Sequence, residues 1–370
     1  MNDECLGRIA FGVRMPLVTP NCGLVDMIVD SVLKATETSG MTLNDGDIIG
    51  ITESIVARAN GLYISVDDIA NDLKKKFNNP ESIVVMRPIF SRNRFSLILK
   101  GIARATKKVY LLLNETTDEV GNKIFNPYTK VNIVDFYREL IEAEGAEAVI
   151  MLKQNELDKH ICTEEGVRNF IIATIHTREE NKLTWNEYLE YFGIAGESTV
   201  LTLADICSDR NPDYGVLGTN KANEEQLKLF PTKEVAKEVT DAVVGQIKEK
   251  LGVNVEGIVC GDGCFKSSDG IWELADPEPA PYYTTGLTGT PNEVKLKYLI
   301  DSPNFNTEED VKAIIKNSCD VDLKGAMISQ GTTPRKVPDI VASLGDLIMT
   351  SGHAGTPVFV IKNFKKTYAD

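Results

Sequence analysis

The strongest constraint on this fold is an alternation of short apolar runs with segments of helical spacing. Strand-like runs fall at residues 9–17, 48–56, 109–113, 146–152, 253–260 and 356–361. Helical spacing occurs at residues 24–35, 132–144 and 232–251, and further helices are predicted after Ser65 and Thr307 and at Pro338. This alternation predicts an α/β protein with mixed α+β sheets.

Size and charge narrow the functional classes. A chain of 370 residues is long enough for two or three domains. Its formal net charge of −14 argues against nucleic acid or an anionic membrane surface as a partner, because both attract clusters of Lys and Arg. No apolar run approaches the ~20 residues that a membrane span needs, and the acidic first residues do not predict a signal peptide.

The cysteines predict a reducing compartment. Seven are scattered along the sequence, an odd number with no Cys-x-x-Cys pair. Reduced, buried thiols in the cytoplasm fit this pattern better than disulfides do. Cys260 and Cys264 are close in sequence, but no histidine or second cysteine pair completes a zinc-ligand set, so a buried thiol is the simpler interpretation. We therefore expect a cytoplasmic protein.

Four segments carry the strongest functional signal, and three of them combine turn residues with polar side chains. The first is residues 15–18, and the second is residues 46–61, where an apolar strand leads into Glu53, Ser54 and Arg58. The third is residues 213–220, and the fourth is residues 345–361. Loops held by regular elements often carry function, so these segments are the candidate site.

Together with a looser match at residues 284–289, the four segments resemble, in the same order, motifs of the coenzyme F(420)-0: gamma-glutamyl ligase family. The resemblance identifies the chain as a divergent, bacterial-type member with a large insertion. It implies a gamma-glutamyl-ligase-like core at residues 1–79 and 206–370. It also implies an inserted α/β domain at residues 80–205, with polar and turn residues gathered near both boundaries.

That family joins glutamate to a carboxylate, using GTP and a divalent metal ion through an acyl phosphate. The resemblance therefore implies a ligase that uses GTP or ATP, with Mg²⁺ or Mn²⁺, to form an amide bond on a small-molecule carboxylate. It also implies a homodimer. Such chemistry needs a phosphate cradle, cations and metal-holding carboxylates more than acids and bases, and we assign no catalytic residue.

The resemblance places nucleotide contacts on the matched segments. Arg58 replaces a family lysine and keeps its charge, in a fork geometry that suits phosphate. The turn at residues 351–356 offers backbone amides that can surround an anion, although an ordinary helix end before a strand would look the same. The nucleotide candidates are Met15, Pro16, Leu17, Val18, Ser54, Arg58, Asn220, Ser351, Gly352, His353, Gly355 and Thr356.

The metal positions depart from the family pattern. Leu217 and Ser351 stand where the family has an aspartate and a glutamate, and leucine cannot bind a cation that demands oxygen ligands. Asp262 remains as a carboxylate, and Glu53 and Asp213 are candidate replacements. A solvated or capping carboxylate is the alternative for the last two. The departure also favours a second hypothesis, a non-catalytic relative that binds a nucleotide or an anionic metabolite.

Two charged clusters lie in the region that the family motifs do not cover. Arg87, Arg92 and Arg94 fall within one short stretch, and Asp118 and Glu119 precede a glycine turn. Together they could hold an anionic substrate and a metal ion, which would permit a third function, phosphoryl transfer or hydrolysis. A salt-bridged surface and a hairpin turn are the structural alternative.

Overall fold

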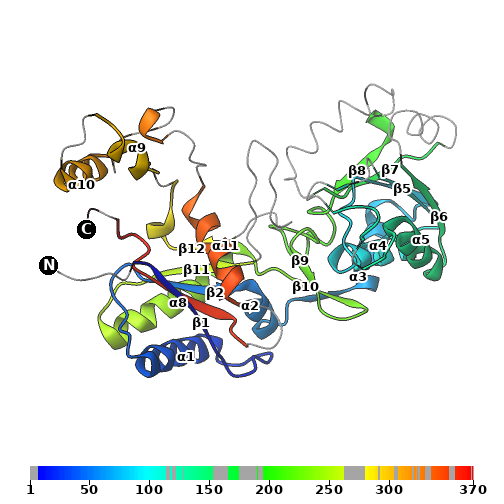
Figure 1. The fold of residues 1–370 in the computed structure, drawn as a ribbon. Helices are drawn as coiled ribbons and strands as arrows, with labels where there is room; N and C mark the ends of the chain where they lie inside the picture. The colour runs from blue at the N-terminus through cyan, green and yellow to red at the C-terminus, as the bar shows by residue number, and fades with distance from the viewer. Residues whose placement is uncertain are drawn as a thin grey trace. The chain divides into compact units, whose positions relative to one another are not determined.

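The computed structural model divides into two compact units, which we describe separately (Figure 1). Unit 1 comprises residues 1–56, 235–263 and 279–370, and unit 2 comprises residues 57–234 and 264–278. The structure describes residues 7–113, 117–118, 122–127, 129–152, 166–174, 190, 195–261, 280–290, 292–303, 307–318, 321, 323, 326–329, 335–349, 355–367 and 369.

Unit 1 is built on a five-stranded mixed sheet with the order β1-β13-β2-β11-β12. β2 and β11 are parallel, and the other neighbours are antiparallel. The elements of this sheet and its main helices are β1 (Ile9–Val13), α1 (Leu24–Ser39), β2 (Ile48–Thr52), α8 (Lys233–Leu251), β11 (Glu256–Cys260), β12 (Tyr282–Tyr283), α11 (Val337–Met349) and β13 (Val358–Lys362). The short elements are η2 (Thr285–Leu287), α9 (Leu296–Ile300), α10 (Glu308–Asn317) and η3 (Met327–Ser329).

Helices cover both faces of this sheet (Figure 1). On one face, the Phe359 ring lies against Gly50 of β2 and Gly345 of α11, where an added Cβ would come within 1.9 and 2.2 Å of ring carbons. On the other face, a Cβ on Gly257 would lie 2.5 Å from Thr240 of α8. Because side chains alternate along a strand, α11 and α8 must pack on opposite faces. Small residues thus let both helices approach the sheet closely.

Unit 2 contains a second, entirely parallel sheet with the order β6-β5-β4-β7-β8. A smaller antiparallel sheet has the order β3-β10-β9. The large sheet and its helices are β4 (Ser82–Met86), α4 (Arg94–Ala105), β5 (Lys108–Leu112), α5 (Ile133–Ala143), β6 (Glu147–Met151), β7 (Asn169–Ile172), η1 (Ala195–Glu197) and β8 (Thr199–Thr202). The remaining elements are β3 (Tyr63–Ser65), α3 (Val66–Lys76), β9 (Thr219–Lys221) and β10 (Gln226–Leu229). α2 (Glu53–Ala59) begins in unit 1 and ends in unit 2.

The structure confirms the predicted fold class and two predicted helix caps, and it shortens one predicted strand. The mixed α/β class is confirmed, and the capping boxes at Ser65 and Thr307 both form. The strand expected over residues 48–56 ends at Thr52, because the chain turns into α2 at Glu53. None of the described helices combines the length and apolar character that crossing a membrane requires.

The compact units do not follow the boundaries expected at residues 79/80 and 205/206. Residues 57–79 and 206–234 group with unit 2. One reason is the close packing of α3 on α4, where a Cβ on Gly101 would lie 2.5 Å from Ile69. Another is that β3 pairs with β10. The origin of residues 80–205 as an insertion stays a prediction.

Candidate functional site

Three of the matched segments meet at one edge of the unit 1 sheet. Val358 pairs with Val13 on one side and Ile51 on the other, and Thr52 pairs with Cys260. The carboxyl ends of β1, β2 and β11 and the beginning of β13 therefore share an edge. We call it the carboxyl edge of unit 1. It receives residues 14–18, 52–54 and 355–357.

Backbone hydrogen bonds join these segments. The Met15 N–H donates to the Gly355 carbonyl at 3.2 Å, and the Thr52 N–H donates to the Pro357 carbonyl at 3.0 Å. Gly355 has a left-handed backbone, with φ of +61°, a conformation that glycine adopts without strain. The stretch that leads into β13 is thus fixed against both neighbouring motif segments, and Gly355 and Thr356 lie at this edge.

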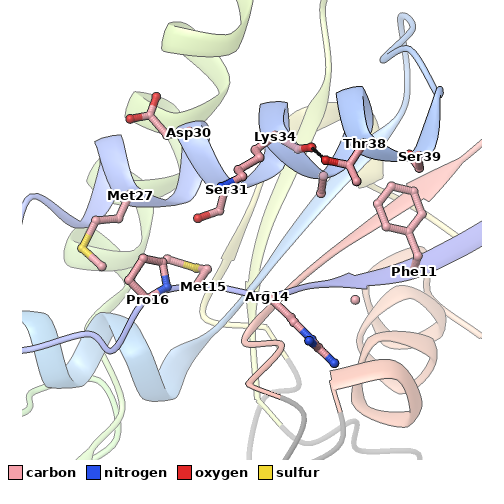
Figure 2. A pocket seen from close by; sticks show the side chains of 12 residues that line it. Phe11, Arg14, Met15, Pro16, Met27, Asp30, Ser31, Lys34, Thr38 and Ser39 are labelled. Atoms are coloured by element: carbon pink, nitrogen blue, oxygen red, sulfur yellow. Dashed lines mark hydrogen bonds between the residues drawn. The ribbon is translucent and has the colours of Figure 1, made fainter.

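A cavity of about 780 Å³ lies beside this edge, between β1 and α1 (Figure 2). Its size falls within the range of small-molecule sites. Met15 and Pro16 line it from the loop after β1. Figure 2 shows Phe11 of β1 with its ring next to the end of α1. The full lining is Phe11, Gly12, Arg14, Met15, Pro16, Met27, Asp30, Ser31, Lys34, Ala35, Thr38 and Ser39.

The α1 side of the cavity comes from one helical face. Met27, Ser31, Lys34 and Thr38 are three or four positions apart and all line the cavity. None of the residues on this face was predicted from the sequence, although the sequence carries a signal for it. These four residues recur at helical spacing, and they lie next to the row of apolar residues that α1 buries in the core.

The cavity carries positive charge. Arg14 and Lys34 are exposed, and among the described residues neither side chain has a hydrogen-bond or ion-pair partner. Asp30, by contrast, pairs with Lys250 at 3.1 Å, so its charge is offset. Arg14 points away from α1 in Figure 2, as expected if it continues the alternation of β1, so Lys34 carries the charge of the α1 wall and Arg14 carries charge on the other side of β1, at the carboxyl edge. An anionic ligand is therefore favoured here.

A carboxylate and two hydroxyl groups also stand at the carboxyl edge. The Glu53 side chain is 5% exposed, and the Thr52 hydroxyl donates to its Oε2 at 3.0 Å. The Ser54 N–H donates to the Thr52 hydroxyl oxygen at 3.4 Å. Of the other loop residues, Leu17 is 77% exposed and Val18 is buried. Leu17 is thus open to contact, whereas Val18 anchors the loop.

The other nucleotide candidates fall elsewhere in the chain. Arg58 is exposed near the end of α2, and Asn220 lies in β9 opposite Lys228, and both belong to unit 2. Ser351, Gly352 and His353 lie outside the described residues. The structure therefore brings together Met15, Pro16, Leu17, Val18, Ser54, Gly355 and Thr356 at one edge.

The metal candidates do not form a site within the described part of the chain. Asp213 accepts a hydrogen bond from the N–H of Lys233 at 2.7 Å, so it caps the first turn of α8. Leu217 is 4% exposed and belongs to the apolar core of unit 2. Asp262 lies outside the described residues. The described residues contain no group of three His, Cys, Asp or Glu side chains placed to hold a metal ion, so the residues present do not by themselves fit one.

The charged candidates of unit 2 lie around the loop between β4 and α4. Arg87 follows β4 directly, and Arg94 is the first residue of α4. Asp118 accepts hydrogen bonds from the backbone N–H groups of Phe90 and Asn122, each at 2.8 Å. The bond to Phe90 holds the loop between β4 and α4 in place. Glu119 lies outside the described residues.

None of the described cysteines forms a disulfide. Cys207 and Cys260 are buried, and Cys22 is half-buried. Burial raises the pKa of the Cys207 thiol to about 12, and nearby Asp72 adds to the increase. Such a thiol is a poor nucleophile. Cys264 lies outside the described residues.

Comparison with known proteins places the chain in a family. A search among curated proteins finds no match. The family model described as F420-0:Gamma-glutamyl ligase matches residues 12–363. This range includes every motif segment at the carboxyl edge and also spans residues 80–205. Since the match covers nearly the whole sequence, the chain belongs to the F420-0:gamma-glutamyl ligase family.

Proposed function

We propose that this protein is a ligase that uses GTP or ATP to form an amide bond on a small-molecule carboxylate, with glutamate as the candidate amine. The observation that carries the proposal is the meeting of three family segments at the carboxyl edge of unit 1, beside a cavity that Met15 and Pro16 line. The family membership supports the reaction class.

The nucleotide would lie in the cavity, with its phosphates toward the carboxyl edge. Phe11, Met15 and Met27 offer apolar contact area for a base or sugar. Lys34 supplies a cation from the α1 wall, and Arg14 supplies a second one at the end of β1, on the side away from α1, for phosphate oxygens that reach the carboxyl edge. Cations against the transferring phosphoryl group are the main requirement of this chemistry. The other predicted contacts, Ser54, Gly355 and Thr356, lie at the same edge.

The reaction would proceed in two steps. A carboxylate oxygen of the acceptor attacks the terminal phosphorus, and the nucleoside diphosphate leaves, which gives an acyl phosphate. The amine then attacks the acyl carbon, inorganic phosphate leaves, and the amine loses a proton as the amide forms. Positioning and charge stabilisation account for most of the catalysis in such transfers.

A requirement for Mg²⁺ or Mn²⁺ is part of the proposal through the family. Glu53 is the metal candidate at the carboxyl edge, and it is nearly buried. Buried carboxylates are expected to have a partner, and Thr52 supplies one in the structure. The described residues do not by themselves form a site for this ion.

A thermal-shift titration of the full chain tests nucleotide binding. GTP and ATP are each added with and without Mn²⁺, and we expect a rise in melting temperature with at least one of them. Arg14→Gln and Lys34→Gln should each raise, by about ten-fold, the nucleotide concentration that is needed for the same rise in melting temperature. Loss of one charge-assisted contact is expected to have an effect of this size. Lys248→Gln removes the same charge from α8 without lining the cavity, and it should leave the titration unchanged. No shift with either nucleotide would refute the proposal.

Turnover is tested with hydroxylamine as a surrogate amine. An acyl phosphate formed from a candidate carboxylate is trapped as a hydroxamate, which is measured by its iron complex. Hydroxamate that depends on both nucleotide and carboxylate supports the ligase. This assay separates the ligase from a binding protein, because binding alone produces no hydroxamate.

A non-catalytic relative that binds a nucleotide or an anionic metabolite is the second candidate. The observation that favours it is the burial of Leu217 in the core at a position where the family has a metal-binding aspartate. It predicts the same thermal shifts without nucleotide hydrolysis. Release of phosphate above the rate of the Arg14→Gln variant would exclude it.

The resemblance further supports a homodimer, and the scattered cysteines support a cytoplasmic location. Neither nucleic acid nor a membrane is part of the proposal, given the net charge of −14. Light scattering coupled to size-exclusion chromatography tests the dimer. A mass of 40.7 kDa, that of one chain, at micromolar concentration would contradict it.

A further inference from the structure

The parallel sheet of unit 2 changes direction in the middle. In chain order, its strands β4, β5, β6, β7 and β8 occupy the positions 3-2-1-4-5, with β4 at the centre. The chain builds outward from β4 on one side and then returns to its other side with β7. In open parallel sheets, ligands bind outside the carboxyl ends of the strands at such a reversal. The strand order therefore makes the carboxyl ends of β4 and β7 a candidate ligand site.

The residues at this reversal are polar and fixed. β4 ends at Met86, and Arg87 follows with a left-handed backbone, φ of +50°. β7 is followed by Ala173 and Thr174, and Thr174 is 2% exposed. The Ala173 N–H donates to the Met86 carbonyl at 2.9 Å, so the two strand ends stay paired up to this point. Arg87 and Thr174 thus follow neighbouring strand ends.

The loop from β4 to α4 is held from outside. The Phe90 N–H donates to Asp118 at 2.8 Å, and the hydroxyl of buried Tyr137 donates to the Ile89 carbonyl at 2.9 Å. Ile89 and Phe90 are themselves buried. A loop fixed in this way loses little conformational entropy when a ligand binds. The loop is therefore suited to present its arginines in a preformed arrangement.

The charge and composition of the loop define the ligand. Arg87, Arg92 and Arg94 lie within it or at its end, in a protein with a net charge of −14. Arg92 is exposed, and its guanidinium has no hydrogen-bond or ion-pair partner among the described residues. Residues 87–93 contain no glycine, so the backbone cannot approach a pyrophosphate as it does in dinucleotide-binding folds. Guanidinium forks instead bind a terminal carboxylate or phosphate.

We propose that unit 2 carries a second ligand site, at the carboxyl ends of β4 and β7, for a small metabolite with a terminal oxyanion. Arg87 and Arg92 bind the oxyanion, and Arg94 stands at the first residue of α4, where its Nη1 donates to the Leu217 carbonyl at 3.4 Å. The site is separate from the cavity of unit 1 and goes beyond the proposed nucleotide function. The ligand carries either a phosphate monoester or a carboxylate, which share this recognition.

Calorimetric titration of the full chain tests the site. Inorganic phosphate and glutarate are the two probes, and chloride at matched ionic strength is the reference. We expect saturable binding of at least one probe, and the tighter probe identifies the phosphate or the carboxylate source. Arg92→Gln and Arg87→Asn should each weaken binding by about ten-fold. Asparagine tolerates the left-handed backbone, so Arg87→Asn removes the charge without forcing the loop to move.

Two control variants make the result specific. Arg168→Gln removes an arginine just before β7, at the opposite end of the same strand, and should change the affinity by less than about two-fold. Arg14→Gln removes a cation of the unit 1 cavity and should also leave the affinity unchanged. The proposal is overturned if neither probe binds saturably, if Arg168→Gln weakens binding as much as Arg92→Gln, or if Arg14→Gln alone abolishes it.

Discussion

Asp47 and Lys362 form an ion pair of 2.6 Å in which the two side chains are 2% and 7% exposed. The pair joins the residue before β2 to the last residue of β13. Asp47 also accepts hydrogen bonds from the backbone N–H groups of Asn44 at 2.8 Å and Asn363 at 3.2 Å. Its remaining lone pairs are thus used, which is the condition under which a buried pair is tolerated.

Removal of one charge from the Asp47–Lys362 pair should lower the stability of the protein strongly. Asp47→Asn leaves the Lys362 charge buried, and we expect the free energy of unfolding to fall by about 3–5 kcal/mol. Urea denaturation followed by circular dichroism measures it. Glu81→Gln is the matched control, because Glu81 and Lys107 form an exposed pair at 2.8 Å, and it should cost less than about 1 kcal/mol. Equal losses in the two variants would contradict a special role for the buried pair.

Gly345 should not tolerate a side chain. Its Cβ would lie 2.2 Å from the Phe359 ring, so Gly345→Ala must displace the ring or α11. We expect a loss of about 1–3 kcal/mol from overpacking. Gly245 lies in α8, and a Cβ added to it would meet no atom within 4 Å, so Gly245→Ala should stabilise the chain by about 0.5–1 kcal/mol. Melting temperatures that shift the same way in both variants would argue against this packing.

Cys207 should resist alkylation in the native protein. Burial raises the pKa of its thiol to about 12, so almost no thiolate exists near neutral pH. Cys22 is half-buried, so its thiol should react with iodoacetamide at least about ten-fold faster than the thiol of Cys207. Peptide mass spectrometry after timed labelling gives both rates. Labelling of Cys207 at the rate of Cys22 would show that this part of unit 2 opens readily.

Asp68 should stabilise the fold by an amount that decreases at acidic pH. The backbone N–H of Ser65 donates to its carboxylate at 2.7 Å, and this bond is the main reason that the pKa of Asp68 is lowered from 3.8. A lowered folded-state pKa means that the contribution is complete above the unfolded-state value. It is lost as the pH falls through the folded-state value.

The charge of Asp68 can be tested by itself. Asp68→Asn keeps an acceptor but removes the charge, and it should lower the free energy of unfolding by about 0.5 kcal/mol at neutral pH. The difference from the parent chain should disappear as the pH falls through the folded-state pKa of Asp68, which lies below 3.8. Glu249→Gln, on the exposed face of α8, is the reference for a general effect of charge. A difference that stays constant down to low pH would rule out the charge as its cause.

Local patterns predicted the local structure well. The capping boxes at Ser65 and Thr307 formed because each is completed within four residues. The run at residues 48–56 was misjudged beyond Thr52, because Ile55 and Val56 are buried in α2 just as they would be in a strand. A short apolar run does not distinguish the two periods.

The arrangement of the site could not be predicted from local patterns. The contact of Met15 with Gly355 requires β1 to pair with β13, and the two strands come from opposite ends of the sequence. The order of the unit 2 strands is equally a property of the whole sheet. Local pattern identified the segments, whereas long-range strand pairing decided which of them meet.

The pairing of β1 with β13 also sets an order of events during protein synthesis. β13 lies between β1 and β2, and it follows every other described strand in the sequence. Residues 57–234 of unit 2 are continuous and leave the ribosome before the later segments of unit 1, and domains generally fold as units as they emerge. β1 cannot pair with β13 until almost the entire chain has been synthesised. A ribosome that stops short of residue 355 therefore releases a chain with an unpaired strand at its amino end and no carboxyl edge, so only translation through β13 yields the proposed nucleotide site.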